Sequence, residues 1–243
     1  TTGDMLTLST QNGINGSFNS ANGVLTISGT ATLAHYQTAL RSITYHSTSE
    51  DLIITASNRT LTWMLTDANS DGAGSATSSG VTSTINITPL SDAPVVTAGA
   101  TLAYTENGSA AIIDNTITIS DVDDIELAGG TVSISSDFTT GDMLTLSTQN
   151  GISGDFNDTT GVLTISGTAT LANYQTALRS ITYHSTSDDP TVTSSSRTLT
   201  WVVTDANSDG AGSATSSGVT STINITPTND VPSPISLIEP AEG

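Results

Sequence analysis

The stretch Arg59-Thr-Leu-Thr-Trp-Met-Leu-Thr66 alternates apolar and polar residues, and it returns at 197–204 with only two changes. Leu61, Trp63 and Leu65 fall on one face and the threonines mostly on the other, which is the period of a half-buried strand. Threonine also favours strands because its Cβ is branched. Similar patterns predict strands over 24–28, 43–47, 81–88, 102–105, 110–113, 116–120 and 131–136. The sequence therefore predicts an all-β fold.

An internal repeat organises the rest of the chain. Residues 1–10 return as 139–148, and adding 138 aligns the two copies without a gap, with 75 of the first 90 positions identical. The copies differ most at 52–58 and 190–196, which predicts an exposed loop, and residues 93–138 have no counterpart in the first copy. We therefore expect the C-terminal two-thirds of a first repeat at 1–91, a complete second repeat at 92–229, and a linker or the start of a next module at 230–243.

The incomplete first repeat has two explanations. The sequence is a piece of a longer array, or the first repeat takes its missing strands from a neighbouring molecule. An isolated half-sandwich would expose unpaired strand edges and an open core. We favour the first explanation and keep the second as an alternative.

One segment in each repeat breaks the strand pattern. Leu33, Tyr36 and Leu40 recur with helical spacing behind Thr32, a residue type that caps helix N-termini, and the segment returns at 170–179. Each repeat is thus predicted to contain one short helix, at an end or edge of the sandwich. Arg41 and Arg59 are expected to hold nearby carboxylates rather than a ligand.

The charge of the chain excludes several classes of partner. It has 23 acidic residues, four arginines, no lysine and no cysteine, for a formal net charge of −19. Such a chain repels nucleic acid and anionic membrane surfaces, and it cannot form disulfides or thiolate zinc sites. No apolar run is long enough to cross a membrane. High salt or a divalent cation would balance the charge, although the acidic residues also serve solubility.

Acidic residues gather at three kinds of place. Asp121-Val-Asp-Asp-Ile-Glu126 follows a predicted strand, and a D-x-N-x-D-G pattern occurs twice. Asp92 and Asp230 each stand between prolines after a strand, and Glu106 lies in an early loop of the second repeat. Calcium takes six to eight oxygen ligands in irregular geometry, so clustered carboxylates suggest calcium sites. The candidate ligands are Asp67, Asn69, Asp71, Asp92, Glu106, Asp121, Asp123, Asp124, Asp205, Asn207, Asp209 and Asp230.

The two D-x-N-x-D-G loops are not EF-hands. The pattern matches the first half of an EF-hand loop, but Ser78 stands where the bidentate Glu would be, and the flanks read as strands. Two interpretations stay open for Asp67 to Gly72 and Asp205 to Gly210. They are either calcium-stabilised hairpin loops or polar hairpins built from good turn formers.

Several motifs together resemble a known family. They are Tyr104-Thr-Glu-Asn-Gly108, Ser120-Asp-Val-Asp-Asp124, Gly161-Val-Leu-Thr-Ile-Ser-Gly167, Tyr174 to Tyr183 and Asn229-Asp-Val-Pro232. They resemble the cadherin-like or Ig-like tandem repeats of giant bacterial RTX-type surface adhesins. The resemblance implies tandem β-sandwich repeats, a bacterial cell-surface or other extracellular location, and calcium at or near domain junctions. By that analogy Glu106, Asp121, Asp123, Asp92 and Asp230 share the ions, although the first linker reads Ser91-Asp92 instead of Asn-Asp.

These observations favour a non-catalytic structural repeat of an extracellular adhesin or surface fibre, rigidified by calcium. Its expected partners are neighbouring repeats of the same chain and, in a fibre, identical chains. The alternatives are a self-assembling filament subunit completed by strand exchange, and a module that binds carbohydrate or another ligand. The sequence contains no G-x-S-x-G, H-E-x-x-H or P-loop motif, and His35, His46 and His184 are expected to be structural. We therefore do not expect an enzyme.

Overall fold

The alternating residues form strands whose two faces differ in burial. The computed structural model describes residues 3–50 and 58–231, in which β16 (Ser196–Asp205) buries every second side chain from Arg197 to Asp205. The chain divides into two compact units, which we call unit 1 (Thr1–Leu90 with Asp209–Ala211) and unit 2 (Ser91–Ser208 with Gly212–Gly243). Residues 52–57 of the expected variable loop and the tail from 232 lie outside the described residues.

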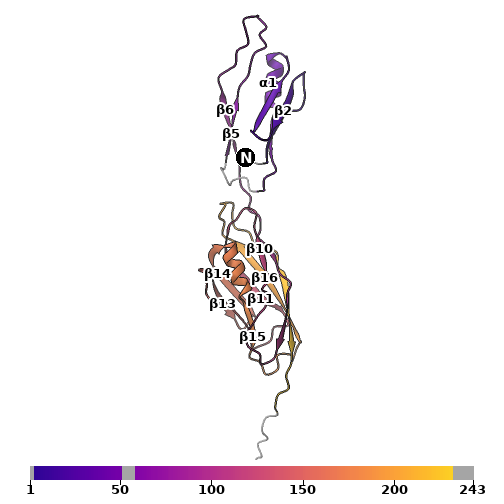
Figure 1. Ribbon diagram of the computed structural model, residues 1–243, viewed down its shortest axis with the longest axis vertical. Helices are drawn as coiled ribbons and strands as arrows, with labels where there is room; N and C mark the ends of the chain where they lie inside the picture. The colour runs from indigo at the N-terminus through magenta and orange to yellow at the C-terminus, as the bar shows by residue number, and fades with distance from the viewer. Residues whose placement is uncertain (1–2, 51–57, 232–243) are drawn as a thin grey trace, which may run out of the picture. The chain divides into compact units, whose positions relative to one another are not determined.

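Unit 2 is an all-β sandwich with one helix (Figure 1). Its larger sheet has the order β13-β14-β11-β16-β17-β8, and two smaller sheets are formed by β12-β15-β9 and by β10-β7. All its neighbouring strands are antiparallel except β17 and β8, which are parallel. The strands are β7 (Val95–Thr97), β8 (Thr101–Thr105), β9 (Ala111–Ile112), β10 (Thr118–Ser120), β11 (Glu126–Ser136), β12 (Asp142–Thr145), β13 (Ser153–Asn157), β14 (Val162–Thr170), β15 (Thr182–Ser185), β16 and β17 (Val219–Thr226).

The core of unit 2 is continuous and closed. Trp201, Tyr183 and Tyr174 are fully buried in it, and the ring centroids of Tyr104 and Tyr183 lie 4.9 Å apart in an edge-to-face arrangement. Strand β17 ends at Thr226, directly before Pro227, which has no N–H with which to continue a ladder. The predicted all-β fold is confirmed.

The short helix is also confirmed in both units. In unit 2, α2 (Leu171–Arg179) begins after Thr170, whose hydroxyl accepts a hydrogen bond from Asn173 N at 3.3 Å. Tyr174, Ala177 and Leu178 form its buried face. The Tyr174 hydroxyl donates to Gly167 O at 2.5 Å, and burial raises the pKa of Tyr174 to about 12. Neither described helix is long and apolar enough to span a bilayer.

Unit 1 repeats the later part of this architecture. Its elements are β1 (Asp4–Thr7), β2 (Asn15–Asn19), β3 (Val24–Ser28), α1 (Leu33–Arg41), β4 (Thr44–Ser47), β5 (Asn58–Trp63) and β6 (Val81–Asn86). They form three two-stranded antiparallel sheets, β1-β4, β2-β3 and β5-β6. Only Leu8, Ile14 and Ala39 are fully buried among its described apolar residues, so its core is much smaller than that of unit 2.

Candidate functional site

The acidic turn between β10 and β11 is the strongest candidate for a binding site. Asp121 Oδ1 accepts hydrogen bonds from the backbone nitrogens of Asp123 at 3.2 Å and Asp124 at 3.1 Å. An Asp that binds the backbone two residues ahead forms an Asx turn, which explains the tight reversal after β10. The turn therefore holds the backbone of Asp123 and Asp124 against the Asp121 carboxylate.

The turn also reaches the linker at the start of unit 2. Asp123 Oδ2 accepts a hydrogen bond from Asp92 N at 2.8 Å. The structure thus brings the backbone of Asp92 to the Asp123 carboxylate, and Asp123 in turn bonds to Asp121 through its own backbone nitrogen. Ser91, beside Asp92, belongs to the same neighbourhood and was not predicted, since nothing marks one serine in a chain so rich in serine.

Several oxygens of this neighbourhood are buried without a partner. Asp121 Oδ2, Asp123 Oδ1 and Ser91 Oγ have no hydrogen-bond partner among the described residues. The pKa of Asp121 is raised to about 6, mainly by burial and next by the side chain of Asp123, while the backbone N–H groups of Asp124 and Asp123 act in the opposite direction. Buried carboxylate oxygens without partners are costly, and a cation would remove that cost.

Asp124 has a different part in the same turn. It is 2% exposed, and its Oδ1 accepts hydrogen bonds from the backbone nitrogen and the hydroxyl of Ser208. The hydroxyl oxygen of Ser208 in turn accepts a hydrogen bond from Ile125 N at 3.1 Å. Asp124 therefore fixes the loop after β16 to the acidic turn. Its Oδ1 has a structural role in this contact.

The D-x-N-x-D-G loops use their side chains on their own backbone. Asp205 accepts from Asn207 N at 3.1 Å and Ala214 N at 2.6 Å, and Asn207 Oδ1 accepts from Gly212 N at 2.7 Å. In the other loop the corresponding bonds from Asn69 N, Ala76 N and Gly74 N measure 3.0, 3.1 and 2.7 Å. Asp71 and Asp209 each accept from the backbone two residues ahead, at 3.1 and 2.9 Å. These hydrogen bonds favour the polar-hairpin interpretation.

Glu106 lies at the other end of unit 2. It follows β8, which pairs with β17 so that Thr105 faces Thr226, whereas the acidic turn lies beside Asp205, at the opposite end of β16 and β17. Glu106 is 4% exposed, its Oε2 accepts from Thr228 N at 2.6 Å, and its Oε1 is buried without a partner in the described chain. Glu106 thus lies at the second linker, which also contains Asn229 and the exposed Asp230, and it does not lie beside Asp92.

The described side chains do not form a complete metal centre by themselves. Within residues 3–50 and 58–231, no three Asp, Glu, His or Cys side chains are grouped closely enough to hold a metal ion. The residues that fit a cation are Asp121 and Asp123, with Ser91 and Asp92 beside them. Calcium accepts backbone carbonyls and water as further ligands, so a pair of carboxylates is compatible with a weak site.

Comparison with curated proteins found similarity over part of the chain. No protein-family model matches it. Halomucin from Haloquadratum walsbyi is 33% identical over 124 residues, which cover 49% of this chain and 1% of halomucin, so the chain spans a very small part of that relative.

Among solved structures, two cadherin proteins overlap most of the chain. Protocadherin gamma B2 extracellular cadherin domains 1–5 cover 93% of this chain, which spans 34% of that structure, with a TM-score of 0.34 and 13% identity. Mouse protocadherin-24 EC1–3 covers 92% of this chain, which spans 58% of that structure, with a TM-score of 0.33 and 11% identity.

Proposed function

We propose that this chain is a non-catalytic structural segment of an extracellular surface adhesin or fibre, in which successive repeats act as spacers stiffened by calcium. The near-identical repeat of 138 residues supports the spacer function, because each copy builds the same elements. The similarity to about one hundredth of halomucin is consistent with a small piece of a long repetitive protein.

The acidic turn beside the first linker carries the calcium part of the proposal. Asp121 and Asp123 each present a buried oxygen without a partner, and Asp123 holds the backbone of Asp92. A bound calcium ion would neutralise the repulsion between the carboxylates of Asp121 and Asp123, and it would tie the linker to the body of unit 2. Extracellular calcium modules bind at about 10⁻⁴–10⁻³ M, and a site filled at ten to a hundred times its dissociation constant contributes about 1.4–2.7 kcal/mol.

Thermal unfolding with and without calcium tests the proposal. We expect excess EGTA to lower the midpoint of the Trp201 transition by several degrees, and millimolar calcium to restore it, whereas sodium chloride at the same ionic strength does not. Asp121→Asn and Asp123→Asn should each abolish most of the calcium-dependent shift, because each removes a ligand charge.

Asp158→Asn is the matched control, since it removes one negative charge from an exposed turn of the same unit. It should leave the calcium response unchanged. If EGTA has no effect on the full chain, or if Asp158→Asn weakens the response as much as Asp121→Asn, the calcium part of the proposal is wrong. Asp71→Asn should also retain the response, because Asp71 binds its own loop.

A further inference from the structure

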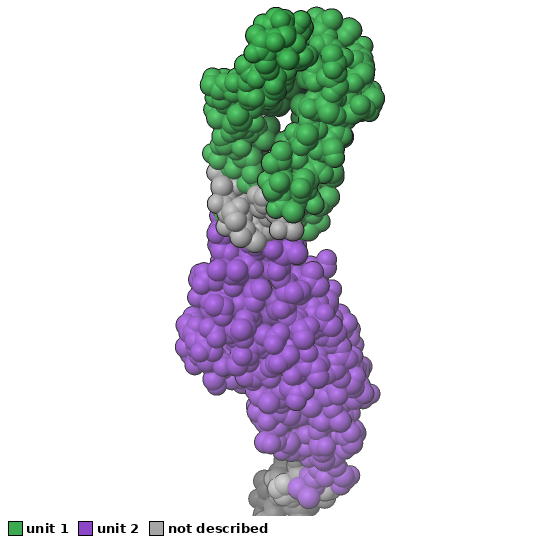
Figure 2. Space-filling view, turned by 45° about the horizontal axis from the view of Figure 1, so that its top comes forward, with its two compact units in different colours: residues 1–90, 209–211 green, residues 91–208, 212–243 purple. Residues whose placement is uncertain are grey.

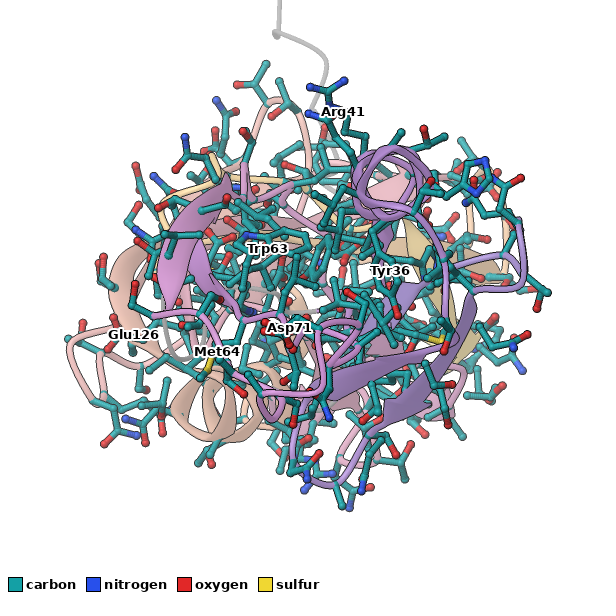
Figure 3. The ribbon with its side chains drawn as sticks, turned by 90° about the horizontal axis from the view of Figure 1, so that it is seen from above. Tyr36, Arg41, Trp63, Met64, Asp71 and Glu126 are labelled. Atoms are coloured by element: carbon teal, nitrogen blue, oxygen red, sulfur yellow. The ribbon has the colours of Figure 1, made fainter. Side chains whose placement is uncertain are left out.

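Unit 1 has an open apolar groove where unit 2 has a closed core. Figure 2 shows the hollow in unit 1, and Figure 3 labels Trp63 and Arg41, two of its lining residues. This cavity has a volume of about 610 Å³ and lies between β3, α1 and β5, with further walls from β1 and β6. Leu25, Leu40, Ile43, Leu61, Trp63 and Leu65 line it.

The same side chains are buried in the other copy. Trp201, Leu178 and Ile181 are at most 1% exposed, whereas their counterparts Trp63, Leu40 and Ile43 are only half-buried. Leu65 is 38% exposed, against 1% for Val203 at the equivalent position. Since the two sequences are nearly identical here, the difference comes from what covers them.

Strand β11 is the main cover in unit 2. It lies between β14 and β16, antiparallel to both, and places Val132 opposite Leu163 on one side and Trp201 on the other. Leu127, Val132 and Ile134 fill the core from this strand. In unit 1 the counterparts of β14 and β16 are β3 and β5, and among the described residues each pairs with one neighbour only.

Glycines of unit 2 show which kind of segment fits between β14 and β16. A Cβ on Gly161 would lie 2.8 Å from the ring of Phe138, whereas a Cβ on the equivalent Gly23 would meet nothing within 4 Å. In β11 itself, a Cβ on Gly130 would lie 2.4 Å from Val202 O, so the strand needs glycine to approach its neighbour. Gly23 has the same backbone conformation as Gly161, with φ of 69° against 71°, but no ring lies against it.

We propose that the groove of unit 1 is a strand-acceptor site for the front segment of a repeat of this kind, with the sequence character of residues 92–138. A strand like β11 enters between β3 and β5, antiparallel to both, so that its Val132 equivalent faces Leu25 and Trp63. A phenylalanine equivalent to Phe138 packs on Gly23. This site does not depend on calcium binding.

The donor we infer is a front segment supplied in the same covalent order as in unit 2. In the complete repeat Phe138 precedes Thr139, the counterpart of Thr1, so a covalently joined segment has the connection that unit 2 already uses. A second copy of this chain is a poor donor, because β11 is an interior strand of its own six-stranded sheet. Giving β11 away would open the core of unit 2.

Fusing residues 92–138 ahead of Thr1 of the full chain tests the site. Trp63 reports on unit 1 and Trp201 on unit 2, and the signal of Trp63 is isolated by subtracting the spectrum of the Trp63→Phe variant of the same chain. We expect the acrylamide quenching constant of Trp63 to fall several-fold, to that of Trp201, and its emission to shift to shorter wavelength. The unfused chain should remain a monomer at all concentrations in sedimentation.

The matched control carries Gly130→Val in the fused segment alone. It should leave Trp63 as accessible as in the unfused chain, because the added side chain meets the backbone of Met64, directly after β5, as Val202 shows in unit 2. Unchanged quenching of Trp63 in the fusion without the substitution overturns the proposal. Equal protection of Trp63 in both fusions also overturns it, because it would show that the added segment covers Trp63 without pairing specifically. Exposure of Trp201 in the fusion, or concentration-dependent dimers of the unfused chain with a protected Trp63, would overturn the inferred donor.

Discussion

One charged cluster occurs in both units with different burial. In unit 2, Arg197 Nε donates to Asp142 Oδ2 at 2.6 Å, Tyr183 donates to Asp142 Oδ1 at 2.6 Å, and both charged side chains are fully buried. Arg197 also donates to the carbonyls of Pro190, Ser194 and Ser196. Burial, followed by the hydrogen bond to Asp142, raises the pKa of Tyr183. The cluster is satisfied on every side and ties β12, β15 and β16 together.

We predict that Asp142→Asn destabilises unit 2 by about 3–5 kcal/mol, the usual cost of leaving a buried charge without its partner. The equivalent change Asp4→Asn should cost less, because the Arg59–Asp4 pair, at 2.7 Å, is 12% and 15% exposed and water can solvate the Arg59 guanidinium that loses its partner. Urea unfolding followed by Trp201 and Trp63 measures the two losses separately. Equal losses in the two units would contradict this account of burial.

The sequence predicts these residues only in part. The expectation that Arg59 holds a carboxylate is confirmed by its pair with Asp4. Arg179, the counterpart of Arg41, instead donates to the carbonyl of Ile117 at 2.7 Å. Asp142 was not singled out, because no local pattern shows that an acidic residue early in a strand will meet an arginine 55 positions later. Such a pair depends on how strands are ordered, which a single sequence does not reveal.

At the scale of elements, Asp114 joins three segments of unit 2. It is 1% exposed, and its Oδ2 accepts from Gly99 N and Ala100 N at 3.0 Å and from the Ser221 hydroxyl at 2.9 Å. Its Oδ1 accepts from Thr116 N at 2.9 Å. Burial alone would raise the pKa of Asp114, but the hydrogen bonds from Thr116, Ala100 and Gly99 outweigh it and lower the pKa. The charged carboxylate thus fixes the start of β8 and the turn before β10 to β17.

We predict a pH-dependent difference between the native chain and Asp114→Asn. A carboxyl group whose folded pKa is lowered contributes stability above its unfolded pKa, about 3.9, and loses it as the pH falls further. At pH 7 the substitution should cost about 1.5–3 kcal/mol, the range for hydrogen bonds to a charged group. The cost should shrink as the pH is lowered below about 4.

Urea midpoints at pH 7, 5, 4 and 3, read from Trp201, give the difference directly. Taking the difference between two chains removes the titration of the other acidic residues, which both chains share. Asp158→Asn serves as the control for the loss of one charge. A cost that stays constant down to pH 3 would show that the charge of Asp114 does not stabilise the fold.

Most elements could be predicted from the sequence, and the exceptions have physical causes. Alternation predicted β3 at its observed bounds, and helical spacing behind Thr32 and Thr170 predicted α1 and α2. Strand β11 was predicted only from 131, but it begins at Glu126. Gly129 and Gly130 resemble a turn in sequence, whereas in the fold they allow β11 to lie close against Val202 and Ile165. The requirement for glycine came from a neighbouring strand distant in sequence.

At the scale of the whole molecule, the two units differ in how completely each buries its core. A fully buried large apolar side chain contributes about 1.5–3 kcal/mol relative to an exposed one. Trp63, Leu40 and Ile43 gain only part of this, whereas their counterparts in unit 2 gain nearly all of it. We predict that urea unfolds the chain in two steps, with the Trp63 transition at a lower concentration than the Trp201 transition.

The Trp63→Phe and Trp201→Phe variants assign the two steps, because each leaves one tryptophan as the reporter. Hydrogen exchange gives a second measurement, in which the amides of β3 should exchange much faster than those of β14, although both strands begin Val-Leu-Thr-Ile-Ser. Sequence-dependent exchange is the same in these two segments, so any difference reports the missing neighbour of β3. A single transition shared by both tryptophans, with equal protection of β3 and β14, would mean that unit 1 draws its stability from something other than its own core.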